Sequence, residues 1–241
     1  MSVSIPTYIL FASHEINRAH QFELLKKDLP EIQVVEPIFP NYTRIPFLSK
    51  MQSISFQRTG KSLLTSEIGV ILSHRKIWQK IKKEGIDGKH YLILESDSKI
   101  VSINTINTHW KAVENKYDLF YWGAWNNNVS IKRSTRVQLN ASYFMGEPLI
   151  KSVYGAYGYS INPKAAGYLL SQLKKVNYPV DLYKHYVNPN DIRIGAISPE
   201  LIATWQTTDS TIRKENLFDK LYRITRIKIF RLRNEILAYF C

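Results

Sequence analysis

The sequence has 241 residues, of which 44% are hydrophobic and 22% charged, the proportions of a globular chain large enough to bury a real core. It contains no run of eighteen apolar residues, and its first residues lack the pattern of a secretory signal, so we expect a cytoplasmic protein. The single cysteine, Cys241, excludes an internal disulfide and a cysteine-ligated metal cluster, whereas the net charge of +13 favours anionic partners.

The first half of the chain alternates between the periodicities of strands and helices. In chain order, the pattern predicts strand 6–11, helix 17–27, strand 32–35, helix 65–81 and strand 91–94. Residues 36–64 are rich in Pro, Ser, Asn and Thr and predict a long irregular loop, a length that usually indicates function or mobility. Strand, helix and strand in succession indicate a parallel sheet with right-handed crossovers.

The second half continues the same alternation with shorter elements. We predict helix 104–116, strand 117–123, a loop over 125–139, strand 154–161, a helix over 163–173 that begins at a proline, a strand or hairpin over 191–197 and a last strand over 201–204. The sequence contains neither an internal repeat nor a low-complexity block.

The most informative segment is the apolar run from Tyr91 to Leu94, which stops at two carboxylates, Glu95 and Asp97. Ligand sites of open α/β sheets lie outside the carboxyl ends of buried strands, so these acids lie where chemistry is usually placed. Alternate strand residues share a face, and the two side chains can therefore hold one divalent cation, an amine or a water between them. Helix caps or solvated loop acids are the alternative interpretation.

The C-terminal segment 213–241 carries eight basic and three acidic residues, a net charge of +5, interleaved with apolar residues at helical spacing. A basic amphipathic helix of this kind is typical of segments that lie on anionic lipid. A helix docked on the protein with a solvated basic face is the other interpretation. Binding to nucleic acid is less favoured, because no nucleic-acid recognition motif accompanies the charge.

Several segments together resemble glycosyltransferase family 25, whose members include lipopolysaccharide and lipooligosaccharide biosynthesis enzymes. They are Ser66-Glu67-Ile68-Gly69, Ser73-His74 with Trp78, Glu95-Ser96-Asp97, Asp118-Leu-Phe-Tyr-Trp-Gly123, Tyr154-Gly-Ala-Tyr-Gly-Tyr159 and Pro179-Val-Asp181. The resemblance spans roughly residues 5–212, so we expect one domain over 1–212 and a basic helical tail over 213–241. The family usually has Glu-Asp-Asp where this chain has Glu95-Ser96-Asp97, which retains the two outer acids.

The resemblance implies a GT-A type, Rossmann-like α/β fold with a mostly parallel sheet flanked by helices. It implies an inverting transfer of a hexose, galactose or glucose, from a uridine-diphosphate sugar to a lipopolysaccharide or lipooligosaccharide acceptor. Glu95 and Asp97 are expected to hold a divalent cation, Mn²⁺ or Mg²⁺, that neutralises the departing diphosphate. Together with the basic tail, this predicts a cytoplasmic enzyme that is peripheral on the inner membrane face and binds anionic lipid and a lipid-linked acceptor.

An inverting transfer also needs a base for the acceptor hydroxyl. Asp181 is the preferred candidate, and Asp209 and Glu147 are the others. The residues expected to contact the donor are Ser13, Arg18, Glu67, His74, Arg75, Glu95 and Asp97. His74 can equally be a core histidine bonded to a backbone carbonyl.

Two other classes of function are compatible with parts of this pattern. A hydrolase would use Glu95 and Asp97 as an acid/base pair, but neighbours at i and i+2 rarely span a glycosidic bond from both faces. A non-catalytic membrane-associated protein that binds a sugar or nucleotide remains the main alternative.

Overall fold

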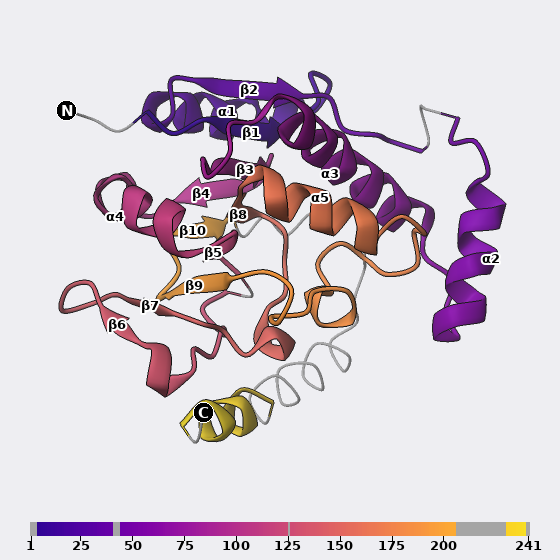
Figure 1. Ribbon diagram of the computed structural model, residues 1–241. Coiled ribbons are helices and arrows are strands. Elements are labelled where there is room, and N and C mark those ends of the chain that lie inside the picture. The colour runs from indigo at the N-terminus through magenta and orange to yellow at the C-terminus, as the bar shows by residue number, and fades with distance from the viewer. Residues whose placement is uncertain (1–3, 41–43, 125, 206–229, 240–241) are drawn as a thin grey trace, which may run out of the picture.

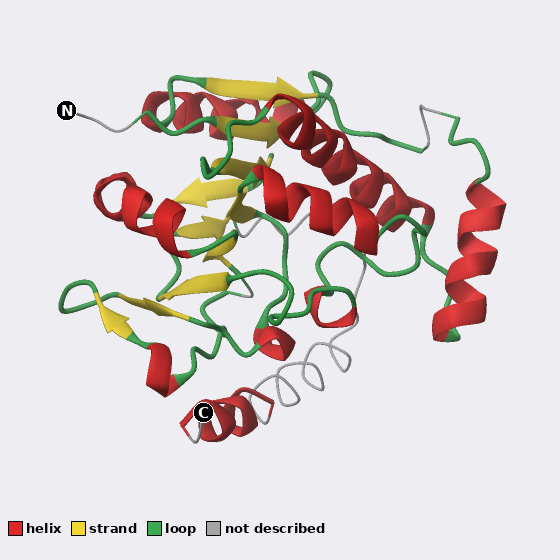
Figure 2. Cartoon of the chain, viewed as in Figure 1, coloured by secondary structure: helices red, strands yellow, loops and turns green. Residues whose placement is uncertain are grey.

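The computed structural model describes residues 4–40, 44–124, 126–205 and 230–239. Its centre is an eight-stranded β-sheet with helices on both faces (Figures 1 and 2). The helices and strands, in chain order, are β1 (Thr7–Leu10), α1 (Ile16–Asp28), β2 (Ile32–Val35), α2 (Leu48–Thr59), α3 (Thr65–Glu84), β3 (Tyr91–Glu95), β4 (Ser98–Ile100), α4 (Ile103–Lys116), β5 (Leu119–Gly123), β6 (Val137–Gln138), β7 (Phe144–Gly146), β8 (Gly158–Ile161), α5 (Pro163–Gln172), β9 (Ile194–Ser198) and β10 (Ile202–Thr204). A further helix over 230–239, called the C-terminal helix below, completes the described chain.

The sheet is mixed, but most of its strands share one direction. The strand order is β2-β1-β3-β8-β5-β9-β7-β6. β1 pairs in parallel with β2 and β3, and β5 with β9, whereas β8 and β7 run against both of their neighbours. Six of the eight strands therefore point the same way, which confirms a mostly parallel sheet, with two opposed strands that a simple strand-helix-strand pattern does not predict.

Alternate side chains of the central strands fill two separate cores. In β5, Tyr121 belongs to the core beneath α3 and α5, whereas Phe120 and Trp122 belong to the core beneath α1 and α4. Figure 1 shows α3 and α5 side by side over one face of the sheet. Because helices cover both faces, the central strands are apolar throughout rather than alternating.

Several elements differ from those expected. Helix α2 interrupts 36–64, which the sequence predicts to be a loop; it buries only Ser55, so its apolar residues show no clear amphipathic pattern. Strands β4, β6 and β7 are two or three residues long, too short to show a period. The last strand forms as predicted, but β10 pairs with β4 in a separate two-stranded sheet. The strand predicted over 154–161 is confined to β8, because the chain turns at Gly155, whose φ is 86°.

Asp118, just before β5, is a buried carboxylate that joins three segments of the chain. Its oxygens accept hydrogen bonds from the side chains of Arg193 at 2.9 Å, Asn162 at 3.0 Å and Lys164 at 2.9 Å. Burial raises the pKa of this carboxyl, but the hydrogen bonds outweigh burial and hold its pKa well below the usual value. The acid of the Asp-Leu-Phe-Tyr-Trp-Gly motif is therefore structural.

We expect Asp118→Asn to lower the free energy of unfolding at pH 7 by about 2 kcal/mol, because charge-assisted hydrogen bonds to a buried group are lost. The folded-state pKa is depressed, so this stabilisation is fully present above the unfolded-state pKa of about 3.9 and is lost progressively as the pH falls from there through the folded-state pKa. Urea unfolding at pH 7 and at about pH 2 measures both values. A difference between wild type and variant that is the same at both pH values would contradict this role.

Candidate functional site

Strand β3 ends at a tight turn that carries both predicted carboxylates. Glu95 is the last residue of β3 and lies beside Leu10, the last residue of the parallel strand β1. Ser98 holds the turn, because its hydroxyl accepts a hydrogen bond from the Glu95 amide at 3.0 Å and donates one to the Tyr157 carbonyl. Asp97 follows in the same turn, at the edge of the sheet where ligands of α/β proteins usually bind.

Asp97 is an unsatisfied carboxylate next to a second carboxylate. Its Oδ1 is buried and accepts no hydrogen bond from any residue that the structure describes. Burial, followed by the negative charge of Glu95, raises the pKa of Asp97 to about 6, and the positive charge of Arg18 opposes that rise. Two neighbouring carboxylates with an unused buried oxygen provide the hard ligands that a divalent cation prefers, so the turn fits such an ion.

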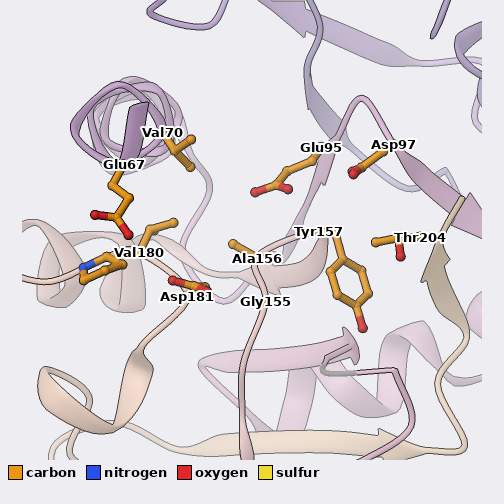
Figure 3. A pocket seen from close by; sticks show the side chains of 11 residues that line it. Glu67, Val70, Glu95, Asp97, Gly155, Ala156, Tyr157, Val180, Asp181 and Thr204 are labelled. Atoms are coloured by element: carbon orange, nitrogen blue, oxygen red, sulfur yellow. The ribbon is translucent and has the colours of Figure 1, made fainter. Parts of the chain in front are cut away.

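Two cavities meet at this turn, and both are lined by Glu95, Asp97 and Val70. The larger cavity has a volume of about 480 Å³ and extends toward the ends of β1 and β2. The smaller cavity has a volume of about 380 Å³ and extends toward Gly155 and Asp181 (Figure 3). The two cavities therefore adjoin at the two carboxylates, an arrangement that suits an extended ligand with two chemically different halves.

The larger cavity has an apolar wall and a polar rim. The wall is made of Leu10, Pro37, Ile38, Phe39, Pro40 and Val70, and the rim of His14, Glu15, Arg18, Ser66, Ser73, Glu95, Ser96 and Asp97. The Phe39 and His14 rings meet edge to face, with their centroids 4.9 Å apart. Gly69 of α3 lets the wall close, because a Cβ at this position would lie 2.5 Å from the Ile38 carbonyl oxygen. The glycine of the Ser-Glu-Ile-Gly segment is thus explained by packing against this wall.

Arg18 brings a positive charge to the rim of the larger cavity. Its guanidinium donates a hydrogen bond to the Ser96 hydroxyl, and Nη1 lies 3.3 Å from the Glu15 carboxylate. Ser96 is the position at which the chain departs from the resemblance. A serine there holds Arg18 in place without neutralising its charge.

Four carboxylates line the smaller cavity. Figure 3 shows Glu67 extending from α3, Glu95 and Asp97 from the β3 turn, and Asp181 from the segment that follows α5. Glu67 also caps its helix, because its Oε2 accepts a hydrogen bond from the Leu64 amide at 2.8 Å. Asp181 lies across the cavity from the β3 turn, so the preferred base and the two expected metal ligands share one site.

His74 contacts Glu95 and does not line either cavity. Its ring is fully buried, with Nε2 3.2 Å from the Glu95 carboxylate and Nδ1 2.8 Å from the Tyr159 hydroxyl. Neither cavity reaches His74, so its direct contact with a ligand stays a prediction. Both ring nitrogens contact side chains, and not the backbone carbonyl of the alternative interpretation.

Three of the remaining predicted residues line neither cavity. Ser13 is exposed on the turn before α1, and Arg75 donates a hydrogen bond to a backbone carbonyl just beyond α5. Glu147 forms an ion pair with Lys132 at 3.0 Å. Because none of these three residues lines a cavity, the structure does not support Ser13 or Arg75 as donor contacts or Glu147 as the base. Asp209 lies outside the described residues.

Two parts of the site were not predicted from the sequence. The apolar wall, with Phe39 and its neighbouring prolines, belongs to a segment without periodicity. The only signal was the cluster Pro37-Ile-Phe-Pro40 directly after a predicted strand. Thr204 lines the smaller cavity from a segment that was predicted only as a strand.

Within 4–40, 44–124, 126–205 and 230–239, no group of three or more His, Cys, Asp or Glu side chains is arranged to hold a metal ion. The pair formed by Glu95 and Asp97 would therefore supply only part of a coordination shell, and an ion held there would need further oxygen ligands from a bound molecule. Phosphate oxygens are the usual source of such ligands.

Comparison with known proteins agrees with the resemblance. The model of the family described as Glycosyltransferase family 25 (LPS biosynthesis protein) matches residues 17–183. This range extends from α1 to just beyond Asp181 and so includes all four carboxylates of the smaller cavity. No curated protein matches the chain significantly.

Proposed function

The chain belongs to glycosyltransferase family 25, and from that premise we propose that it moves a hexose, galactose or glucose, from a uridine-diphosphate (UDP) sugar to a lipopolysaccharide or lipooligosaccharide acceptor with inversion at the anomeric carbon. The observation that carries the proposal is the position of Asp181 across one cavity from the Glu95 and Asp97 turn. A mostly parallel sheet with its site beside the ends of β1 and β3 is consistent with a GT-A type fold.

The Glu95 and Asp97 carboxylates would hold a divalent cation, Mn²⁺ or Mg²⁺, together with the two phosphates of the donor. When bound, such an ion neutralises the charge that develops on the departing UDP. The unsatisfied Oδ1 of Asp97 supports this assignment, because a buried carboxylate oxygen without a partner is costly unless a ligand binds it.

The larger cavity suits the nucleotide half of the donor. Phe39 and the prolines beside it offer an apolar surface against which a flat pyrimidine can pack. Arg18 brings its charge to the same cavity beside the β3 turn, where the diphosphate would lie. A guanidinium binds phosphate oxygens through two parallel hydrogen bonds, so Arg18 would orient the leaving group.

The smaller cavity then receives the hexose and the acceptor, with Asp181 as the base. In an inverting transfer the acceptor oxygen bonds to the anomeric carbon on the face opposite UDP while the bond to the UDP oxygen breaks. The acceptor hydroxyl proton passes to the Asp181 carboxylate. Glu67, which lines the same cavity, would accept a hydrogen bond from a sugar hydroxyl with its remaining acceptor capacity.

The proposed function is tested by supplying a panel of UDP-hexoses and a lipooligosaccharide acceptor with Mn²⁺ or with a chelator, and measuring released UDP. We expect acceptor-stimulated release with UDP-galactose or UDP-glucose that requires the metal. Absence of UDP release from every donor in the presence of Mn²⁺ and acceptor would contradict the proposal.

We also propose that the protein works at the cytoplasmic face of the inner membrane, bound to anionic lipid through its C-terminal segment. In the C-terminal helix, Asn234 and Ala238 are fully buried, while Leu232 and Ile236 on the opposite face are 60% and 51% exposed. Arg231, which forms an ion pair with Glu235 at 2.8 Å, and Arg233 are exposed beside this apolar pair. The helix thus both docks on the domain and presents an apolar stripe beside arginine side chains. Residues 213–229 of the predicted tail lie outside the described residues.

No helix in the described part of the chain combines the length and apolarity needed to cross a bilayer. We expect Leu232→Glu combined with Ile236→Glu to weaken binding to vesicles that contain anionic lipid by at least about 10-fold, since burial of each such side chain contributes about 1.5–3 kcal/mol. UDP release in solution should not change. Co-sedimentation with anionic and with neutral vesicles measures the effect, and equal binding by wild type and variant would contradict it.

A further inference from the structure

A buried hydrogen-bond chain ends on the Glu95 carboxylate. Helix α3 places His74 and Trp78 one turn apart, and Tyr159 of β8 lies against both of them. The Tyr159 hydroxyl lies 2.8 Å from Trp78 Nε1 and 2.8 Å from His74 Nδ1, and His74 Nε2 lies 3.2 Å from Glu95 Oε1. His74, Trp78 and Tyr159 are all fully buried.

The donors and acceptors of this chain fix the direction of every bond. The Glu95 carboxylate can only accept, so the neutral His74 ring carries its proton on Nε2 and donates it to Glu95 Oε1. His74 Nδ1 then accepts from the Tyr159 hydroxyl, whose oxygen accepts from the Trp78 indole, a group that can only donate. This tautomer follows from the partners of the ring and satisfies every group in the chain.

We propose that His74 is a positioning residue that fixes the Glu95 carboxylate for cation binding. One carboxylate oxygen is occupied by the imidazole, and the orientation of the carboxylate then presents the other oxygen for the ion. This inference rests on the proposed function, because it assumes that Glu95 is a metal ligand. Groups that orient the ligands of a metal influence its affinity without contacting it.

A second buried histidine, His90 directly before β3, makes similar hydrogen bonds without contacting a carboxylate through its ring. His90 Nδ1 lies 2.9 Å from the Ser160 hydroxyl, which accepts a hydrogen bond from Trp122 Nε1 at 2.9 Å. His90 Nε2 lies 2.9 Å from the Tyr117 carbonyl, so this chain ends on the backbone and not on a carboxylate. His90 therefore provides a matched control for the loss of a buried imidazole.

The test measures Mn²⁺ binding directly, by electron paramagnetic resonance titration of free Mn²⁺ against the full chain in the presence of UDP. We expect His74→Phe to weaken Mn²⁺ binding by about 10–100-fold, and His74→Gln, which keeps an N–H donor on this side chain, to restore most of it. Tyr159→Phe should weaken Mn²⁺ binding to a smaller extent, because without the tyrosine hydroxyl no group donates to His74 Nδ1 and the ring proton is no longer held on Nε2. His90→Phe should leave the Mn²⁺ affinity within about 2-fold of wild type while it lowers the melting temperature.

The outcomes separate this inference from the proposed function. If wild type binds Mn²⁺ and a folded His74→Phe binds it equally well, the positioning role is overturned while the cation site stands. Loss of affinity in His90→Phe equal to that in His74→Phe would also overturn it, because the effect would then reflect general destabilisation. If His74→Phe does not fold, Tyr159→Phe and His74→Gln decide, and unchanged Mn²⁺ affinity in Tyr159→Phe overturns the role. Absence of Mn²⁺ binding in wild type would instead contradict the cation site itself.

Discussion

Replacement of Asp97 by asparagine is expected to lower kcat/KM for sugar transfer by at least about 100-fold. The amide has the shape of the carboxylate but not its charge, so the β3 turn would retain one anion where the proposed cation needs two. The loss should appear as a higher Mn²⁺ requirement as well as slower UDP release. Asp87→Asn, at an exposed turn that lines neither cavity, is the matched control and should behave as wild type.

The pKa of Asp97 gives this prediction a pH dependence and a stability effect. With a pKa of about 6, the carboxyl is neutral at pH 5 and charged at pH 7.5, so Mn²⁺ should bind more weakly as the pH falls through 6.

Because the folded-state pKa of Asp97 lies above the unfolded value, ionisation of Asp97 destabilises the metal-free fold as the pH rises from about 4 to about 6. Metal-free Asp97→Asn should therefore have a melting temperature a few degrees higher than that of wild type at pH 7.5. Each kcal/mol gained in the free energy of unfolding raises the melting temperature by about 2–4 °C. A lower melting temperature for the variant, together with unchanged Mn²⁺ binding, would mean that Asp97 is a structural acid.

Replacement of Asp181 by asparagine is expected to lower kcat for transfer by about 10²–10⁴-fold, the range that a general base contributes. Mn²⁺ and UDP should still bind within about 2-fold of wild type, because Asp181 lies across the cavity from the β3 turn. Single-turnover transfer combined with Mn²⁺-dependent UDP binding separates the two effects.

Glu147→Gln is the control for Asp181→Asn, since Glu147 forms an ion pair with Lys132 and lines neither cavity. It should transfer sugar at the wild-type rate. Full activity of Asp181→Asn would remove Asp181 from the mechanism and would direct attention to Asp209, which lies outside the described residues.

The parts of the site that could be predicted from sequence are those carried by strongly periodic segments. The run from Tyr91 to Leu94 is apolar because helices cover both faces of β3, and a charge directly after such a strand must lie at the sheet edge. Glu95 and Asp97 were found by this reasoning, and Asp181 by its place in the family motif. All three line the same cavity.

The parts that could not be predicted depend on contacts between segments distant in sequence. In the sequence His74 is indistinguishable from the other buried residues of α3, which share its helical spacing. Its contact with Glu95 depends on how α3 packs over β3. The wall formed by Pro37 to Pro40 has no period, because it packs against Gly69 through backbone and proline rings. Two opposed strands, β7 and β8, likewise follow from sheet pairing and not from any local pattern.

The central claim is that the β3 turn and a bound cation together hold the diphosphate of the donor. Calorimetric titration of UDP into the protein, with Mn²⁺ and with a chelator, tests it most directly. We predict that UDP binds in the presence of Mn²⁺, and that removal of the metal or the Asp97→Asn substitution weakens binding by at least about 10–100-fold. UDP binding that is equally tight without metal, or that is unaffected by Asp97→Asn, would contradict the claim.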